Sequence, residues 1–237
     1  MLSAKRASAA CAATLPLALV LTGCVSTQQI AARARLVSAR TLASQTPIEV
    51  TRGNPSVSVG PVTVIRARAG TAIVVPLRND TSNTLTDLPI SVTVRTARHE
   101  VYLNRSASLD YFQTHVAAIG PRASTDWVFT TDARIPAGRA VALVGLAQLH
   151  PSVARSLPLI EVSSGRGGSV TVANGSGIPQ YDLQVYAVAI RAGRDVGAGR
   201  AEVSHLGSHA TTTLSVTLLG DGQGAALRLI ALPTIFS

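Results

Sequence analysis

The chain has 237 residues and a formal net charge of +9, with 21 basic and 12 acidic residues, and only 3% of its residues are aromatic. Its arginines are scattered along the sequence, whereas nucleic-acid-binding proteins usually concentrate positive charge and interleave aromatic residues for stacking. Two cysteines, Cys11 and Cys24, and a single methionine leave too few sulfur ligands for a thiolate or thioether metal site. Composition therefore argues against nucleic-acid binding, redox chemistry and copper handling.

Residues 1–23 have the composition of an export signal. Lys5 and Arg6 form a short positive region, and a mostly apolar run of small residues follows them. The run is shorter and richer in alanine than a bilayer-spanning helix, which needs about 20 apolar residues. We therefore expect this segment, including Cys11, to be removed during export.

The export segment ends in Leu21-Thr22-Gly23-Cys24, which resembles the lipobox of bacterial lipoproteins. A leucine lies three residues before the cysteine, and small residues fill the two positions between them. The resemblance implies cleavage between Gly23 and Cys24 and attachment of acyl chains, such as palmitate, to Cys24. It also implies a membrane anchor on the extracytoplasmic face of the bacterial cell membrane. The alternative is an ordinary secretory signal in which Cys24 has no role.

A helix is predicted next, within a lipid-anchored linker segment that covers residues 24–46. Residues 27–45 contain no glycine or proline and are rich in alanine, leucine, arginine and glutamine, which are good helix formers. Pro47 ends the helix, because the residue before a proline disfavours the helical conformation. The helix either spaces the following domains from the bilayer or lies against them. Its weak apolar stripe consists of Ile30, Ala34, Val37 and Thr41.

From Ile48 onward the sequence consists of short runs of valine, isoleucine, leucine and threonine separated by turn-forming residues. Apolar and polar residues alternate in Val57-Ser58-Val59 and again between Leu88 and Val94. Short alternating strands with frequent turn signals are typical of an all-β sandwich or barrel. The fold class predicted is therefore all-β and antiparallel.

The strand region repeats itself. Asn79 and Asn174 are 95 residues apart, as are Asp87 and Asp182, and these four residues anchor the repeat. Further along, Gly120 and Gly207 are only 87 residues apart, which indicates an eight-residue insertion in the first copy. Duplication of one sandwich module would leave this pattern. We expect one module at residues 47–154 and a second at residues 159–237.

In both copies, a strand ending in Val-x-Leu/Val-x-Asn is followed by a short alternating strand, as in Val75-Pro-Leu-Arg-Asn79 and Val170-Thr-Val-Ala-Asn174. This pattern resembles the immunoglobulin-type modules of bacterial envelope proteins, such as the FxLYD group. The resemblance implies two tandem immunoglobulin-like β-sandwiches after the N-terminal helix.

The inserted segment between His99 and His115 is where potential metal ligands and aromatic residues gather. One hypothesis is a small-ligand or metal pocket on a long loop, which is where function is often added to a rigid scaffold. The alternative is a loop that its aromatic residues pin to the sandwich while its charged residues face water. His99 and His115 are the metal candidates, without recognisable ligand spacing, and their neighbours are Glu100, Tyr102, Asp110, Tyr111 and Phe112.

No motif for a catalytic nucleophile is present, and the glycine-rich segments do not precede a predicted helix, as a phosphate-binding loop would require. We therefore predict no enzymatic activity and no cofactor. The predicted function is that of an exported lipoprotein, anchored through Cys24, whose modules bind or position an envelope protein or cell-wall component. The alternative is an envelope receptor that binds a small ligand or metal through the His99–His115 loop.

Overall fold

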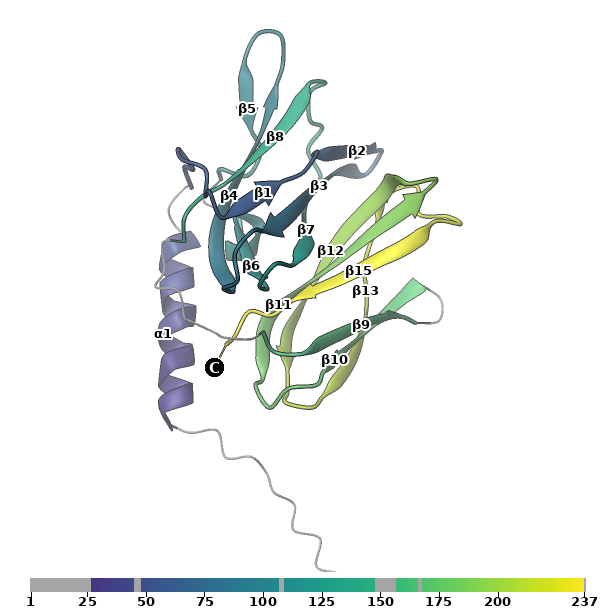
Figure 1. The fold of residues 1–237 in the computed structure, drawn as a ribbon. Helices are drawn as coiled ribbons and strands as arrows, with labels where there is room; N and C mark the ends of the chain where they lie inside the picture. The colour runs from purple at the N-terminus through teal and green to yellow at the C-terminus, as the bar shows by residue number, and fades with distance from the viewer. Residues whose placement is uncertain (1–26, 45–47, 107–108, 148–156, 166–167, 237) are drawn as a thin grey trace, which may run out of the picture.

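The computed structural model describes residues 27–44, 48–106, 109–147, 157–165 and 168–236. The predicted signal, its cleavage site and Cys24 lie outside these ranges. One helix, α1 (Thr27–Ser44), lies alongside a body made of β-strands (Figure 1). Nowhere in these ranges is a helix both long and apolar enough to cross a bilayer.

The first sandwich contains two antiparallel sheets. In one sheet, the central strand β3 pairs with β1, β2 and β7, and in the other, β4 pairs with β5, β6 and β8. A short 3-10 helix, η1 (Tyr111–Gln113), precedes β6. The strands are β1 (Val57–Val59), β2 (Thr63–Ala67), β3 (Gly70–Asn79), β4 (Leu85–Arg95), β5 (Glu100–Tyr102), β6 (His115–Ile119), β7 (Ser124–Thr131) and β8 (Arg139–Val144).

The second sandwich follows the same plan. One sheet has the order β9-β10-β13, and the other has the order β14-β12-β11-β15. The all-β class with antiparallel sandwiches and a short N-terminal helix is therefore confirmed. The strands are β9 (Ile160–Ser164), β10 (Ser169–Asn174), β11 (Gln180–Arg191), β12 (Arg194–Leu206), β13 (Thr211–Ser215), β14 (Leu219–Gly220) and β15 (Ala226–Leu232).

The two sandwiches also share their pairing register. Leu77 of β3 lies opposite Thr125 of β7, and Val172 of β10 lies opposite Thr212 of β13. These residues are related by the same offsets of 95 and 87 residues that the sequence repeat has. Between the matched strands, the first sandwich contains β5, η1 and β6 where the second has the single long strand β12.

Asn79 ends β3 and is fully buried. Its Nδ2 donates to the carbonyl oxygens of Asn83 at 2.7 Å and Gly120 at 2.9 Å, and its Oδ1 accepts from the amide of Thr81 at 2.9 Å. The side chain therefore joins the turn after β3 to the turn after β6. Such a contact satisfies backbone groups that a buried turn would otherwise leave unpaired.

Asn174 makes the same contacts in the second sandwich. Its Nδ2 donates to the carbonyl oxygens of Ile178 at 2.9 Å and Gly207 at 3.0 Å, and its Oδ1 accepts from the amide of Ser176 at 3.0 Å. Asp87 and Asp182 are matched as well, because both adopt the left-handed backbone conformation, with φ of 51° and 52°. Aspartate tolerates this conformation better than most residues.

The sandwiches pack against each other through a continuous apolar core. Its main cluster contains Trp127 and Phe129 of β7 together with Tyr186 and Val188 of β11. A smaller cluster fills the second sandwich. The strands of the two sandwiches lie between residues 57 and 144 and between residues 160 and 232. Because residues 148–156 lie outside the described ranges, the boundaries of the modules, 47–154 and 159–237, stay a prediction.

The buried asparagines allow a test of the repeat. We expect Asn79→Ala and Asn174→Ala each to lower the free energy of unfolding by about 2 kcal/mol, because each leaves buried carbonyl groups unpaired. Asn83→Ala is the control, since Asn83 is exposed and contributes backbone groups to the turn. Urea unfolding followed by circular dichroism measures the difference. Equal stability of the Asn79 and Asn83 variants would contradict the role of the asparagine side chain.

Candidate functional site: the inserted segment at the junction of the sandwiches

The inserted segment does not bring the two candidate histidines together. His99 is exposed in the turn between β4 and β5, whereas His115 is 2% exposed at the start of β6. Along β4, Pro89 pairs with His115 and Arg95 pairs with Glu100. These positions are six residues apart, or about 20 Å along a strand, so the two rings cannot hold one metal ion. Within the described residues, no three histidine, cysteine, aspartate or glutamate side chains form a metal-binding group.

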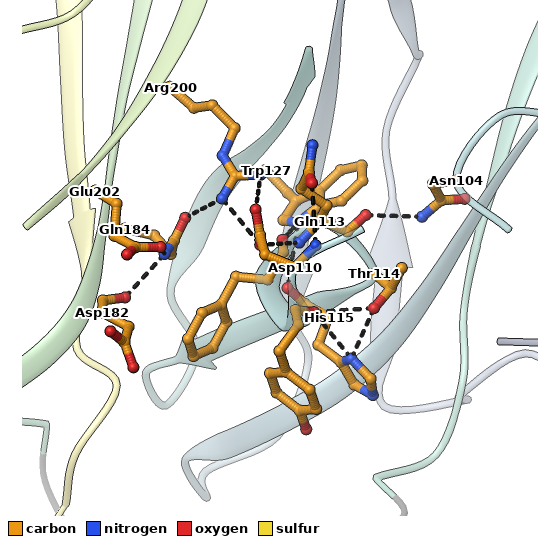
Figure 2. Close-up of polar contacts among 12 residues, drawn as sticks. Asn104, Asp110, Gln113, Thr114, His115, Trp127, Asp182, Gln184, Arg200 and Glu202 are labelled. Carbon is orange, nitrogen blue, oxygen red and sulfur yellow. Dashed lines mark hydrogen bonds and ion pairs between the residues drawn. The ribbon is translucent and has the colours of Figure 1, made fainter. Parts of the chain in front are cut away.

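His115 is part of the core. Its ring stacks on Tyr111 with centroids 3.8 Å apart, and its Nδ1 lies 3.1 Å from both the Tyr111 carbonyl oxygen and the Thr114 hydroxyl (Figure 2). Burial lowers the pKa of His115 to about 4. The ring is therefore neutral at pH 7, and its Nδ1–H donates to the Tyr111 carbonyl.

The rest of the inserted segment is pinned to the sandwich by η1. Asp110 caps this short helix by accepting from the Gln113 amide at 3.0 Å, and Gln113 Oε1 accepts from the Asp110 amide at 3.1 Å. Trp127 Nε1 donates to the carbonyl oxygens of Phe112 at 3.1 Å and His115 at 3.3 Å. Tyr111 and Phe112 thus belong to the core, as the alternative of a pinned loop expects, whereas Tyr102 is exposed.

The same segment reaches across to the second sandwich. Arg200 of β12 forms an ion pair with Asp110 at 3.0 Å and donates to Gln184 Oε1 at 2.6 Å (Figure 2). Gln184, which is fully buried, donates in turn to Glu202 at 3.1 Å and to the carbonyl oxygen of Asp182 at 2.8 Å. The insertion therefore supplies a polar link between the copies.

Helix α1 is docked on this junction through a buried ion pair. Arg40 lies 2.8 Å from Asp87, and both side chains are 7% exposed. The guanidinium also lies 5.0 Å from the ring centroid of Phe112 and 5.5 Å from that of Tyr111. Burial raises the pKa of Asp87, and the neighbouring guanidinium opposes this shift. Arg40 thus fixes the C-terminal half of α1 to the first sandwich.

The N-terminal half of α1 contacts the second sandwich. Arg33 lies over the ring of Tyr181, which also stacks on His205 with centroids 4.6 Å apart. Tyr181 immediately precedes Asp182, the residue equivalent to Asp87. The helix therefore contacts matching corners of the two copies.

The inward face of α1 differs from the one that the apolar stripe suggested. Arg33 and Arg40, seven residues or about two turns apart, face the body. In contrast, Ile30 is 55% exposed and Val37 is 36% exposed. Of the two placements left open by the sequence, α1 lies against the domains, and it does so through its arginines.

A groove of about 390 Å³ also lies at the junction, between β1, β3 and β7 on one side and β15 on the other. Asp126 lines it and forms an ion pair with Arg228 at 2.6 Å, and Arg228 lies 3.5 Å from Asp195. Burial raises the pKa of Asp126, and Arg228 opposes this shift. Two of the charged groups that line the groove, Asp126 and Arg228, are thus paired with each other.

Comparison with protein-family models and with curated proteins found no match. A solved chain from a chaperone–tip adhesin complex of CFA/I fimbriae biogenesis is similar at 7% sequence identity, with 72% of this chain and 98% of that chain covered. The TM-score of this superposition is 0.20, and the likeness therefore carries no argument about function.

Burial of His115 predicts a specific pH dependence of stability. The unfolded chain, with a histidine pKa of about 6.5, binds the proton more readily than the folded one. The contribution of His115 to the free energy of unfolding is therefore complete above pH 6.5. It falls as the pH approaches 4, by up to about 3 kcal/mol. In His115→Asn, the asparagine amide can replace the Nδ1 donor but does not titrate. The free energy of unfolding of this variant should therefore depend less on pH between pH 7 and 4 than that of the wild type. The exposed His209 gives the control variant His209→Asn, which should keep the wild-type slope, and the same slope in both variants would contradict the prediction.

The docking of α1 can be tested at Arg40. Arg40→Met leaves Asp87 buried without its partner, which costs about 3–5 kcal/mol when such a charge stays in place. We expect the amide hydrogens of α1 to exchange faster in this variant, and adding Asp87→Asn to restore most of the lost stability. Arg35→Met, on the exposed face of α1, is the control. Unchanged exchange in Arg40→Met would show that the ion pair does not hold the helix.

Proposed function

We propose that the protein is a non-catalytic exported lipoprotein, anchored through lipidated Cys24 to the extracytoplasmic face of the bacterial cell membrane. In this proposal, its two β-sandwiches bind or position another envelope component, either a protein or a cell-wall polymer. The observation that supports it best is the docking of α1, which begins three residues after Cys24 and contacts both sandwiches through Arg33 and Arg40.

This docking would make the tether short and stiff. Three residues span at most about 11 Å, and the 18 residues of α1 extend the helix for about 27 Å along the body. A body that is fixed to its own tether helix cannot swing freely on a long linker. Such an anchor suits a protein that holds its far end at a set distance and orientation from the membrane.

Lipid attachment would supply the anchoring energy. Each buried methylene group contributes about 0.8 kcal/mol, so that one acyl chain binds a membrane reversibly and two chains bind it stably. The sandwiches themselves need no apolar surface for this purpose, and they remain available for a partner.

Substitution of the lipidated cysteine tests the anchor. We expect Cys24→Ser to abolish acylation, and the protein should then leave the membrane fraction or remain as an unprocessed precursor. Cys11→Ser is the matched control, because Cys11 lies in the segment removed during export and its loss should change nothing. Fractionation with carbonate washing, followed by mass spectrometry of the N-terminal peptide, measures both outcomes. If Cys24→Ser still remained in washed membranes as a processed chain, the anchor would be wrong.

A further inference from the structure

The fold gathers arginines that are scattered in the sequence onto one end of the first sandwich. They come from the end of β2 and the turn after it, from the end of β4 and the turn after it, and from the loop between β7 and β8 with the first residue of β8. All of them are exposed. We call this set the arginine surface. It consists of Arg66, Arg68, Arg95, Arg98, Arg134 and Arg139.

Strand pairing and hydrogen bonds make the arginine surface continuous. Arg95 of β4 lies directly opposite Arg139 of β8, so their Cα atoms are about 5 Å apart. Arg98 lies in the turn that follows Arg95. On the other side, Arg66 donates to the carbonyl oxygen of Pro136 at 3.0 Å, in the loop that joins Arg134 to Arg139.

The positive charge of the arginine surface is only partly neutralised. Of its members, Arg95 forms an ion pair, with Glu100 at 3.3 Å. For Arg68, Arg98, Arg134 and Arg139, the described part of the chain offers no carboxylate within ion-pair distance. Each unpaired guanidinium keeps its hydrogen-bond donors free for an anion.

The second sandwich differs at the corresponding end. In its β11–β12 region, Arg191 pairs with Asp221 at 2.8 Å, and Asp195 lies 3.5 Å from Arg228. Two of the arginines there are therefore neutralised by aspartates. Arg194, which is exposed at the start of β12, forms no ion pair within the described residues. The corresponding end of the second sandwich therefore leaves fewer arginines unpaired than the arginine surface does.

The arginine surface lies far from the start of the tether helix. Asp87, where α1 docks, and Arg95 are eight residues apart on β4, or about 26 Å at the usual rise per residue. Figure 1 shows the β4–β5 turn and the first turn of α1 at opposite ends of the molecule. With Cys24 lipidated, the surface would point away from the protein's own membrane.

The chemistry of the surface favours phosphate groups in a chain. Guanidinium groups bind phosphate through two parallel hydrogen bonds, and six of them on three loops exceed what one small anion can contact. The aromatic Tyr102, which is 45% exposed, is in contact with Arg105, whose guanidinium lies 5.4 Å from its ring centroid. A single-stranded nucleic acid is usually bound with aromatic side chains on which its bases stack.

We propose that the arginine surface binds a linear phosphate-bearing polymer of the cell envelope that lacks bases. This proposal rests on the proposed function in one respect, which is that the polymer lies outside the membrane to which Cys24 would be anchored. Binding itself depends on the arginines alone and takes place without the lipid.

The test uses the full chain and linear inorganic polyphosphate as the probe, with binding measured by calorimetry at several salt concentrations. Arg68→Gln, Arg98→Gln and Arg134→Gln are combined in one variant. At about fivefold per arginine, we expect a loss in affinity of about 100-fold, and a salt slope that is shallower by about two, since each phosphate contact on a flexible chain contributes about 0.7.

A matched control removes the same charge elsewhere. Its three substitutions, Arg35→Gln, Arg78→Gln and Arg122→Gln, alter exposed residues, and affinity should stay within about threefold of the wild type. A double variant with only Arg98→Gln and Arg134→Gln covers the case in which the triple variant does not fold, because both residues lie outside the strands. Its affinity for polyphosphate should fall by about 25-fold.

Three results would overturn the proposal. These are absence of polyphosphate binding by the wild type, equal losses in the two triple variants, and tighter binding of a single-stranded oligonucleotide or anionic phospholipid vesicles at equal phosphate concentration. Failure of Cys24→Ser to leave the membrane would instead contradict the anchor and leave the binding result unchanged.

Discussion

The buried ion pair between Arg40 and Asp87 is the contact on which the arrangement of helix and sandwiches depends. Removing two charges from water is costly, so such a pair contributes more to a unique arrangement than to stability. Here the geometry is specific, because Asp87 has a left-handed backbone and the Arg40 guanidinium lies near two aromatic rings. A helix with a weak apolar stripe has little else to set its position along the body.

The shared plan of the two sandwiches explains why one helix can contact both of them. Asp87 and Asp182 have the same backbone conformation at matching corners, and two arginines two turns apart reach these corners. The copies have nevertheless diverged, since Arg40 meets a carboxylate while Arg33 meets the ring of Tyr181. The insertion in the first copy adds the link from Asp110 to Arg200, which makes the pair of sandwiches asymmetric.

Features with a local signal could be predicted from the sequence. Alternating apolar and polar residues predicted the all-β class. Asn79 and Asn174, which share the 95-residue spacing of Asp87 and Asp182, indicated turns that the structure shows to be alike. The inward face of α1 could not be predicted, because the partner of Arg40 is 47 residues away. Likewise, the burial of His115 depends on the stacking partner that η1 supplies, and the arginine surface exists only after three loops meet. The lipobox and the FxLYD likeness remain resemblances.

The ion pair between Arg40 and Asp87 would set how far the arginine surface lies from the membrane. At physiological salt, an exposed charge acts over about 8 Å, which is a fraction of the length of β4. If Cys24 is lipidated as proposed, a docked helix would therefore keep the arginines beyond the field of anionic lipids in that membrane. A released helix would let the body tilt, and the same arginines would bind those lipids instead, since each contributes about 1 kcal/mol at such a surface. The buried pair would in this way decide which anion the exposed charges meet.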